Sequence, residues 1–149
     1  MDIGFRPATA QDFDYCASLY FAGMEATIRQ LGLDMATHTA SFRERWDAAE
    51  VRIITRDGSD IGWMQTAPES DAVFLKQLFV DGPLRGQGIG TEVMHRLIIE
   101  AANTGRGMAL GVVKTNPAKR LYDRLGFRVT HDDGRKFYMR RDAHPQASA

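Results

Sequence analysis

The sequence is poor in cysteine and in long hydrophobic runs, and each shortage excludes a class of protein. Cys16 is the only cysteine among 149 residues, so a disulfide framework and a cysteine-based zinc site are both excluded. This usage is typical of a reducing compartment, and we expect a cytoplasmic protein. No apolar stretch approaches the roughly 18 residues that a membrane helix needs. The first residues are too polar and acidic for a signal peptide.

The sequence also lacks net charge, because 19 basic side chains balance 19 acidic ones. Such a balance gives no long-range field that would attract nucleic acid or an anionic membrane, and we expect neither as a partner. Lysine is scarce, with four residues against 15 arginines, which we interpret as a compositional bias of the lineage. The four histidines are not spaced as metal ligands, so no metal site is expected.

The length and the hydrophobic content predict one domain with one core. No internal repeat and no linker rich in Gly, Pro or Ser divides the chain. We place the domain at residues 1–142. The tail, residues 143–149, is expected to be disordered because it has nothing large to bury.

The hydrophobic pattern predicts a mixed α/β fold in the order strand, two helices, three strands, helix, strand, helix, two strands. The helices are expected over residues 9–30, 39–49, 88–105 and 116–126, and the strands over residues 3–8, 51–56, 59–67, 72–80, 107–113, 127–131 and 135–141. Hairpins and helical crossovers together imply a mixed sheet with helices packed on it.

Turn and cap residues support these boundaries. The pair Asp57-Gly58 is a strong hairpin signal between two strands. Thr9 is expected to cap the first helix. The short helix after residue 115 should have Asn116 as its N-cap, Pro117 at its first position and Gly126 at its end.

The segment LFVDGPLRGQGIGTEV, residues 78–93, places three glycines between an apolar strand and the strongest helix of the chain. A helix begins with free backbone N–H groups and the positive end of its dipole, which suits an anion. Glycines let a phosphate approach that backbone because no Cβ is in the way. Arg85 would add a fork-shaped cation at the mouth. A tight turn with close packing is the more common explanation of a lone Gly-x-Gly, so the phosphate interpretation needs a second signal.

Two better-known phosphate cradles do not fit this segment. A dinucleotide fingerprint would need a third glycine where Thr91 stands, and a P-loop would need Lys and Ser or Thr where Gly90 is followed by Thr91-Glu92. The segment therefore indicates a different phosphorylated ligand.

Two motifs together carry a family resemblance. VDGPLRGQGIGTEVM resembles the acetyl-CoA-binding turn of the GNAT superfamily of N-acetyltransferases, whose Arg/Gln-x-x-Gly-x-Gly/Ala pattern is met by Arg85, Gly88 and Gly90. VVKTNPAKRLYDRLGF is similar to the family's downstream Asn, short helix and Tyr followed by Gly-Phe. The resemblance implies a single-domain acyl-CoA N-acyltransferase fold. Its sheet would be mixed and mostly antiparallel, with about six to seven strands, about four helices and central parallel strands that splay at the cofactor.

The resemblance also implies acetyl-CoA as cosubstrate. The strand before the turn would pair its backbone with the pantetheine arm, the turn would hold the pyrophosphate, and Asn116 would contact the cofactor near its arm, beside its role as N-cap. The implied cofactor-binding residues are Leu78, Phe79, Val80, Arg85, Gly86, Gln87, Gly88, Ile89, Gly90, Thr91 and Asn116.

For the chemistry, the resemblance implies direct attack by a primary amine on the thioester in a ternary complex. Tyr122 matches the family's tyrosine that gives a proton to the leaving thiolate, although it would also pack well on its helix face. Relatives often carry a carboxylate on the strand before the turn, but AVFLKQLFV has none. Glu25 is our preferred general base, although it could equally be a solvated charge on its helix. A proton-carrying water or a desolvating pocket could supply the neutral amine in place of a base. His38 and His131 are weaker candidates.

A non-catalytic acyl-CoA-binding or regulatory module of the same fold is the competing hypothesis, because it would need no carboxylate on the strand. The acceptor amine is open between a small molecule and a peptide. Because relatives often form homodimers, a homodimer is a candidate state.

Overall fold

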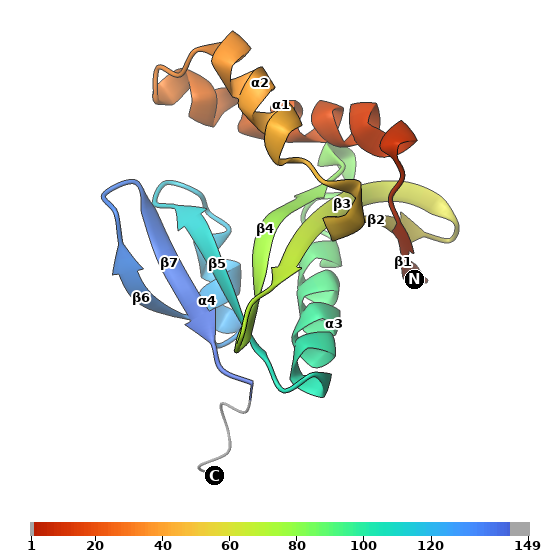
Figure 1. Ribbon diagram of the computed structural model, residues 1–149, viewed down its shortest axis with the longest axis vertical. Helices are drawn as coiled ribbons and strands as arrows, with labels where there is room; N and C mark the ends of the chain where they lie inside the picture. Colours follow the sequence, from red (N-terminus) through yellow and green to blue (C-terminus); the bar gives the residue numbers. More distant parts are fainter. Residues whose placement is uncertain (1, 144–149) are drawn as a thin grey trace. The chain divides into compact units, whose positions relative to one another are not determined.

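The computed structural model describes residues 2–143 and divides the chain into two compact units (Figure 1). The first unit comprises the chain up to Gln65 together with Gln77–Ile89. The second unit comprises Thr66–Lys76 and the chain from Gly90 onward. Residues 144–149 of the predicted tail lie outside the described part, and the predicted domain boundary at residue 142 stays a prediction.

Among residues 2–143, the sheet has seven strands in the order β1-β2-β3-β4-β5-β7-β6, most of them antiparallel, and there are four α-helices. This arrangement confirms the predicted mixed α/β fold. The strands are β1 (Ile3–Pro7), β2 (Val51–Arg56), β3 (Ser59–Pro68), β4 (Ala72–Val80), β5 (Gly107–Val113), β6 (Arg128–Asp132) and β7 (Lys136–Arg141). The strands β3 and β4 each contribute residues to both units.

In the first unit, β2 pairs antiparallel with both β1 and β3, so that Phe5 pairs with Ile54 and Ile53 pairs with Trp63. The predicted hairpin turn between β2 and β3 is confirmed, because Asp57 has φ +52° and Gly58 has φ +86°. Two successive left-handed residues match the twist of the flanking strands.

The helices of the first unit are α1 (Phe13–Gln30) and α2 (Met35–Arg45), which lie side by side in Figure 1. The predicted range 39–49 for the second helix was wrong by about one turn at each end. The Asp34 side chain accepts a hydrogen bond from the Thr37 N–H, so the helix begins earlier than its apolar residues indicate. The residues Ala48–Glu50 form a separate 3-10 turn.

The core of the first unit is aromatic. The Tyr20 ring stacks on Phe42 at 4.4 Å between centroids, and Trp63 stacks on Phe79 at 5.6 Å. Cys16 and Trp63 have no solvent exposure. The core therefore joins α1, α2 and β3 to the last residues of β4.

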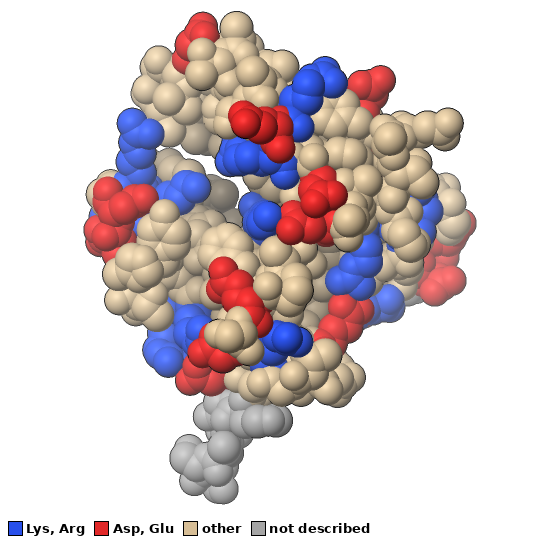
Figure 2. Space-filling view, in the orientation of Figure 1, with Lys and Arg blue, Asp and Glu red and all other residues tan. Residues whose placement is uncertain are grey.

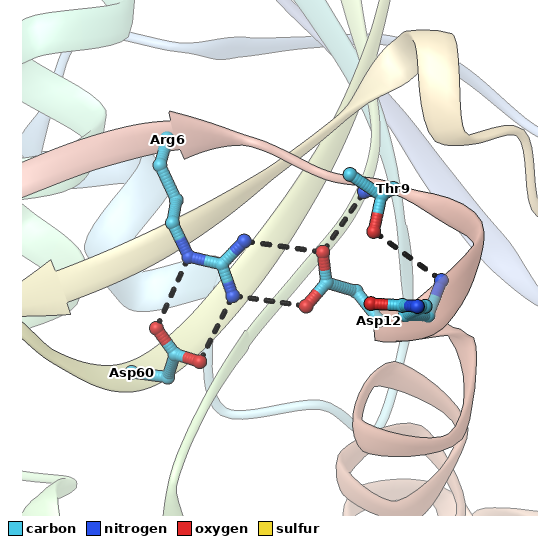
Figure 3. A network of polar contacts seen from close by, with 5 residues as sticks. Arg6, Thr9, Asp12 and Asp60 are labelled. Atoms are coloured by element: carbon cyan, nitrogen blue, oxygen red, sulfur yellow. Dashed lines mark hydrogen bonds and ion pairs between the residues drawn. The ribbon is translucent and has the colours of Figure 1, made fainter.

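A polar network fixes the start of α1 to the edge of the same unit (Figure 3). The Arg6 guanidinium lies between two carboxylates, 2.9 Å from Asp12 Oδ1 and 2.9 Å from Asp60 Oδ2. Asp12 also accepts a hydrogen bond from the Thr9 N–H. Thr9 caps the 3-10 turn Ala10–Asp12, and the N-cap of α1 is Asp12 and not Thr9 as predicted. The Arg6 hydrogen bonds lower the pKa of Asp12, so this carboxylate stays charged at neutral pH.

In the second unit, β5 pairs in parallel with the first half of β4, Ala72–Leu75 against Gly107–Leu110, and antiparallel with β7. Within the described part of the chain, β6 pairs only with β7, and it is exposed along its whole length. The splay that the family resemblance implies for the central parallel strands stays a prediction.

The helices of the second unit are α3, which begins at Ile89 and ends at Asn103, and α4 (Lys119–Arg124). The predicted start of α4 at Asn116 was wrong by three residues. The Asn116 side chain instead accepts a hydrogen bond from the Ala118 N–H in a turn that precedes the helix. The predicted end is confirmed, because Gly126 has φ +91°.

Charged side chains of both signs are interspersed on the face shown in Figure 2, in keeping with the zero net charge. Within residues 2–143, none of the helices combines the length and the apolar character that crossing a bilayer would require.

Candidate active site

The glycine-rich turn follows β4 and a short 3-10 turn at Gly82–Leu84. Gly86 has φ +81° and Gly88 has φ +80°, a backbone conformation that L-residues with a side chain rarely adopt. A Cβ atom at either position would meet no described atom within 4 Å. These two glycines are therefore required by the backbone shape and not by close packing, and the space above them is open.

The turn leads directly into α3. The first N–H groups of a helix have no partner within it, and the 15 residues of α3 carry the positive end of the dipole to this point. Gly90 has an ordinary φ, and a Cβ atom there would meet Leu121 Cδ2 of α4 at an unstrained 3.8 Å. Ile89 is buried, so it can offer a ligand only its backbone, and Thr91 is half-buried. The geometry suits an anion.

Arg85, the first residue after the 3-10 turn, has a side chain that points back to the end of β4. Its Nε donates to the Val80 carbonyl at 3.2 Å. Its Nη2 lies 3.2 Å from the point where a Cβ atom on Gly23 would be, so the guanidinium rests against α1. Arg85 is therefore anchored at the end of β4, and its contact with a phosphate stays a prediction.

The last residues of β4 differ from one another in what they offer a ligand. A Cβ atom on Gly62 would lie 2.4 Å from the Phe79 carbonyl oxygen, so this carbonyl faces β3. The backbone groups of neighbouring strand residues point in opposite directions, so those of Leu78 and Val80 face the other way. Because the Val80 carbonyl accepts from Arg85 Nε, we expect backbone pairing with a pantetheine arm from Leu78 and from the Val80 N–H. Phe79 has a packing role, and its contact with the arm stays a prediction.

Tyr122 lies on α4 in the second unit, with 9% of its surface exposed and its ring edge-on to Phe127 at 5.8 Å. Its hydroxyl has no hydrogen-bond partner among residues 2–143. Burial raises the pKa of Tyr122 above its ordinary value of 10.0, so the phenol keeps its proton at neutral pH. A protonated and unpaired hydroxyl can donate a proton.

Asn116 and Lys119 are occupied within the second unit. Asn116 Oδ1 accepts the Ala118 N–H at 2.9 Å in the turn before α4, whose N-cap is Ala118, so the predicted N-cap role was wrong. Its contact with a cofactor stays a prediction. Lys119 pairs with Asp123 one helical turn later, at 2.9 Å.

Glu25 lies on the exposed side of α1. Its carboxylate pairs with Arg29 at 2.5 Å and is 60% exposed. It borders a cavity of about 440 Å³ whose other lining residues are Phe21, Ala22, Ile28, Arg29, Leu33 and Met35. Two residues along a helix turn by about 200°, so Glu25 does not share the helix face of Gly23, which contacts β4 and Arg85. Its role as a base stays a prediction.

The histidines and carboxylates form no metal cluster in the described part of the chain, where no three such groups converge. His131 is exposed on β6 and stacks on Tyr138 at 4.6 Å.

More than half of the chain, residues 47–129, matches the profile of the acetyltransferase (GNAT) domain. The chain belongs to the GNAT acetyltransferase family. No curated protein matches its sequence at a significant level.

Solved structures of GNAT acetyltransferases and their relatives share the fold. The PaiA N-acetyltransferase of Thermoplasma acidophilum, in complex with coenzyme A, is 16% identical with a TM-score of 0.77 and covers 95% of this chain and 99% of its own. An acetyltransferase of Thermus thermophilus is 18% identical with a TM-score of 0.67, covering 95% and 97%. A GNAT acetyltransferase of Elizabethkingia anophelis with acetyl-CoA bound is 18% identical with a TM-score of 0.56, covering 62% and 74%.

Two features of this GNAT acetyltransferase were missed from the sequence. The Tyr20 hydroxyl and His38 Nε2 lie 2.5 Å apart, and the Tyr20 ring meets Phe79 edge-on at 5.4 Å. Tyr20 and His38 lie 18 positions apart, and the sequence between them carries no signal of that contact. Gly23 did carry one, because a glycine inside a strong helix usually marks a close approach by another element.

His38 is half-buried, and burial and the positive charge of Arg45 lower its pKa below the ordinary value of 6.5. The imidazole is therefore neutral at neutral pH and able to accept a proton. The imidazole belongs to the same aromatic cluster as Phe79. Phe79 lies on β4, the strand that is expected to receive the cofactor arm.

Proposed function

We propose that this GNAT acetyltransferase transfers an acetyl group from acetyl-CoA to a primary amine, by direct attack in a ternary complex. The observation that carries the proposal is the pair of left-handed glycines, Gly86 and Gly88, open to solvent at the start of α3. Family membership makes acetyl-CoA the acetyl donor, and two structures of similar fold hold coenzyme A or acetyl-CoA.

The chain's residues would share the work between binding and chemistry. The N–H groups of the turn and of the first residues of α3 would bind the pyrophosphate, and Leu78 and Val80 would bind the pantetheine amides. Much of the acceleration would come from holding amine and thioester together.

Tyr122 would act as the general acid. As the amine nitrogen forms its bond to the acetyl carbon, the carbon–sulfur bond breaks and its electron pair leaves on sulfur. Tyr122 gives its proton to that thiolate and is restored from solvent. The hydroxyl suits the step because it is protonated and unpaired.

The attacking amine must first lose a proton. An amine with a pKa near 10.4 is neutral only about once in several thousand molecules at pH 7. We propose His38 as the acceptor of that proton, because it is neutral, bonded to Tyr20 and close to Phe79 through that ring. Glu25 is the alternative that the sequence favours, with the cavity beside it as a place for the acceptor.

The second candidate function is a non-catalytic acyl-CoA-binding module. The observation in its favour is the strand β4, which carries no carboxylate among Ala72–Val80. This hypothesis predicts binding of coenzyme A without turnover.

Thermal melts with acetyl-CoA, CoA, NAD and ATP test the binding. A ligand at about 100 times its dissociation constant adds roughly 2.7 kcal/mol, which moves a domain of this size by several degrees. We expect a shift with the two CoA species and little with NAD or ATP. A panel of small amines and peptides, with release of CoA as readout, then separates turnover from binding. Absence of any shift with CoA contradicts the proposal.

A further inference from the structure

Arg56, the last residue of β2, reaches the glycine-rich turn. Its Nη1 donates to Gln87 Oε1 at 3.1 Å, across 31 positions of sequence. Both residues belong to the first unit, and Arg56 is half-buried while Gln87 is exposed. The turn is thus hydrogen-bonded, through its Gln87 side chain, to a strand that β3 and β4 separate from it in the sequence.

Gln87 is the residue between the two left-handed glycines. Gly86 and Gly88 have φ near +80°, with no described atom close to where a side chain would be. Successive N–H groups in such turns form a concavity that binds anions. Glycine is also the residue with the most backbone freedom, so an unanchored turn would lose the most entropy on binding. A side-chain anchor at Gln87 reduces that loss.

Arg85, the cation expected at this turn, makes its hydrogen bond at the end of β4. Arg85 is bonded to the Val80 carbonyl and lies against Gly23 of α1. Arg56 is therefore the guanidinium that hydrogen-bonds to the turn itself. Its charge is held at the turn through the Gln87 side chain, and a cation near an anion-binding turn is favourable.

We propose that Arg56 is a positioning residue of the anion-binding turn, which it holds through Gln87 in the shape that receives the coenzyme A pyrophosphate. This inference rests on the proposed function. It assigns to β2 a part in cofactor binding that the glycine motif does not contain.

The test compares Arg56→Met, Gln87→Ala and the double variant with the unaltered chain. Arg52→Met is the matched control, because it removes the same charge from the same strand, where Arg52 lies over the Phe5 ring. The dissociation constant of coenzyme A is measured by isothermal titration calorimetry. Hydrogen exchange of the segment 85–90 is measured in the ligand-free protein, and thermal melts check that each variant is folded.

We expect each single variant to raise the dissociation constant about tenfold, as for loss of one charge-assisted hydrogen bond. The double variant should be no worse than the weaker-binding single variant, because the two side chains act through one contact. Hydrogen exchange of the segment 85–90 should accelerate in Arg56→Met and in Gln87→Ala. Arg52→Met should match the unaltered chain in its dissociation constant and in its hydrogen exchange.

Three results would overturn the inference. The first is an unchanged dissociation constant in Arg56→Met. The second is additive losses in the double variant, since Arg56 would then act independently of Gln87. The third is unchanged hydrogen exchange. If the unaltered chain binds no coenzyme A, the proposed function fails as well, so the two failures are distinguishable.

Discussion

The glycine-rich turn and the surroundings of Tyr122 offer a ligand opposite things. The turn offers backbone N–H groups and open space, and it depends on side chains being absent at Gly86 and Gly88. The Tyr122 site offers one hydroxyl on a ring that is 9% exposed, and it depends on side chains being packed around it. A site that depends on backbone shape can therefore be damaged by adding one side-chain atom. A site that depends on a buried side chain can be damaged by removing one.

The comparison predicts that binding and chemistry respond to different substitutions. Changes at the turn should alter the dissociation constant of coenzyme A, whereas changes at Tyr122 should alter the rate at saturation. The four substitutions below test this separation, in order of decreasing expected effect.

Tyr122→Phe removes the hydroxyl and keeps the ring against Phe127. We expect kcat to fall by about 10²–10⁴-fold, as for loss of a general acid, with the dissociation constant of coenzyme A unchanged. Steady-state kinetics and calorimetry measure the two quantities. Tyr138→Phe is the control, since it removes the same atom from a half-buried tyrosine that donates to Asp133. Full activity in Tyr122→Phe would show that Tyr122 has a packing role and is not the general acid.

His38→Gln keeps a hydrogen-bonding side chain beside Tyr20 and removes the titrating group. We expect kcat/KM to fall by about 10²-fold, the low end for a general base. The pKa of His38 is lowered in the folded state, so the unaltered chain should lose stability relative to the variant as pH falls below about 6.5. Chemical denaturation at several pH values measures that difference. His131→Gln, on exposed β6, should change neither quantity, and an equal loss there would contradict the assignment.

Gly88→Ala forces a side chain into a left-handed backbone at a cost of about 1–2 kcal/mol. If the turn shifts to relieve that strain, its N–H groups no longer converge, and we expect about a tenfold rise in the dissociation constant of coenzyme A. Gly134→Ala, with φ +92° in the turn between β6 and β7, imposes the same strain away from α3. Equal weakening by both variants would show that general destabilisation, and not the turn, is responsible.

Glu25→Gln should have the smallest effect. The carboxylate is exposed and paired with Arg29, and such pairs contribute about 0.3–0.5 kcal/mol to stability. We expect kcat to change less than about twofold, because a base would have cost at least about 10²-fold. A loss of that larger size would establish Glu25 as the base and displace His38.

The parts of the fold that were predictable from sequence are those where local chemistry decides the conformation. The strands Ala72–Val80 and Gly107–Val113 were predicted with their observed ends, because each is a continuous apolar run between turn residues. The hairpin at Asp57-Gly58 was predictable for the same reason. The second helix was not, because Asp34 caps it ahead of its first buried residue, Phe42.

The candidate site divides in the same way. The glycines of the turn could be recognised because a left-handed backbone almost requires glycine. The contacts of Tyr20 with His38 and of Arg56 with Gln87 could not, since each joins residues that only the folded chain brings together. The anchored position of Arg85 depends likewise on the close approach of Gly23.

The burial of the single cysteine has a consequence for measuring activity and opening of the fold. Cys16 has no solvent exposure, and burial raises its pKa to about 12, so in the native state it should be almost inert toward alkylating reagents. The free thiol of released coenzyme A can then be followed with a colorimetric reagent against almost no background. Any slow labelling of the protein itself counts excursions in which α1 lifts from the aromatic core, and a bound ligand that braces α1 should slow that labelling.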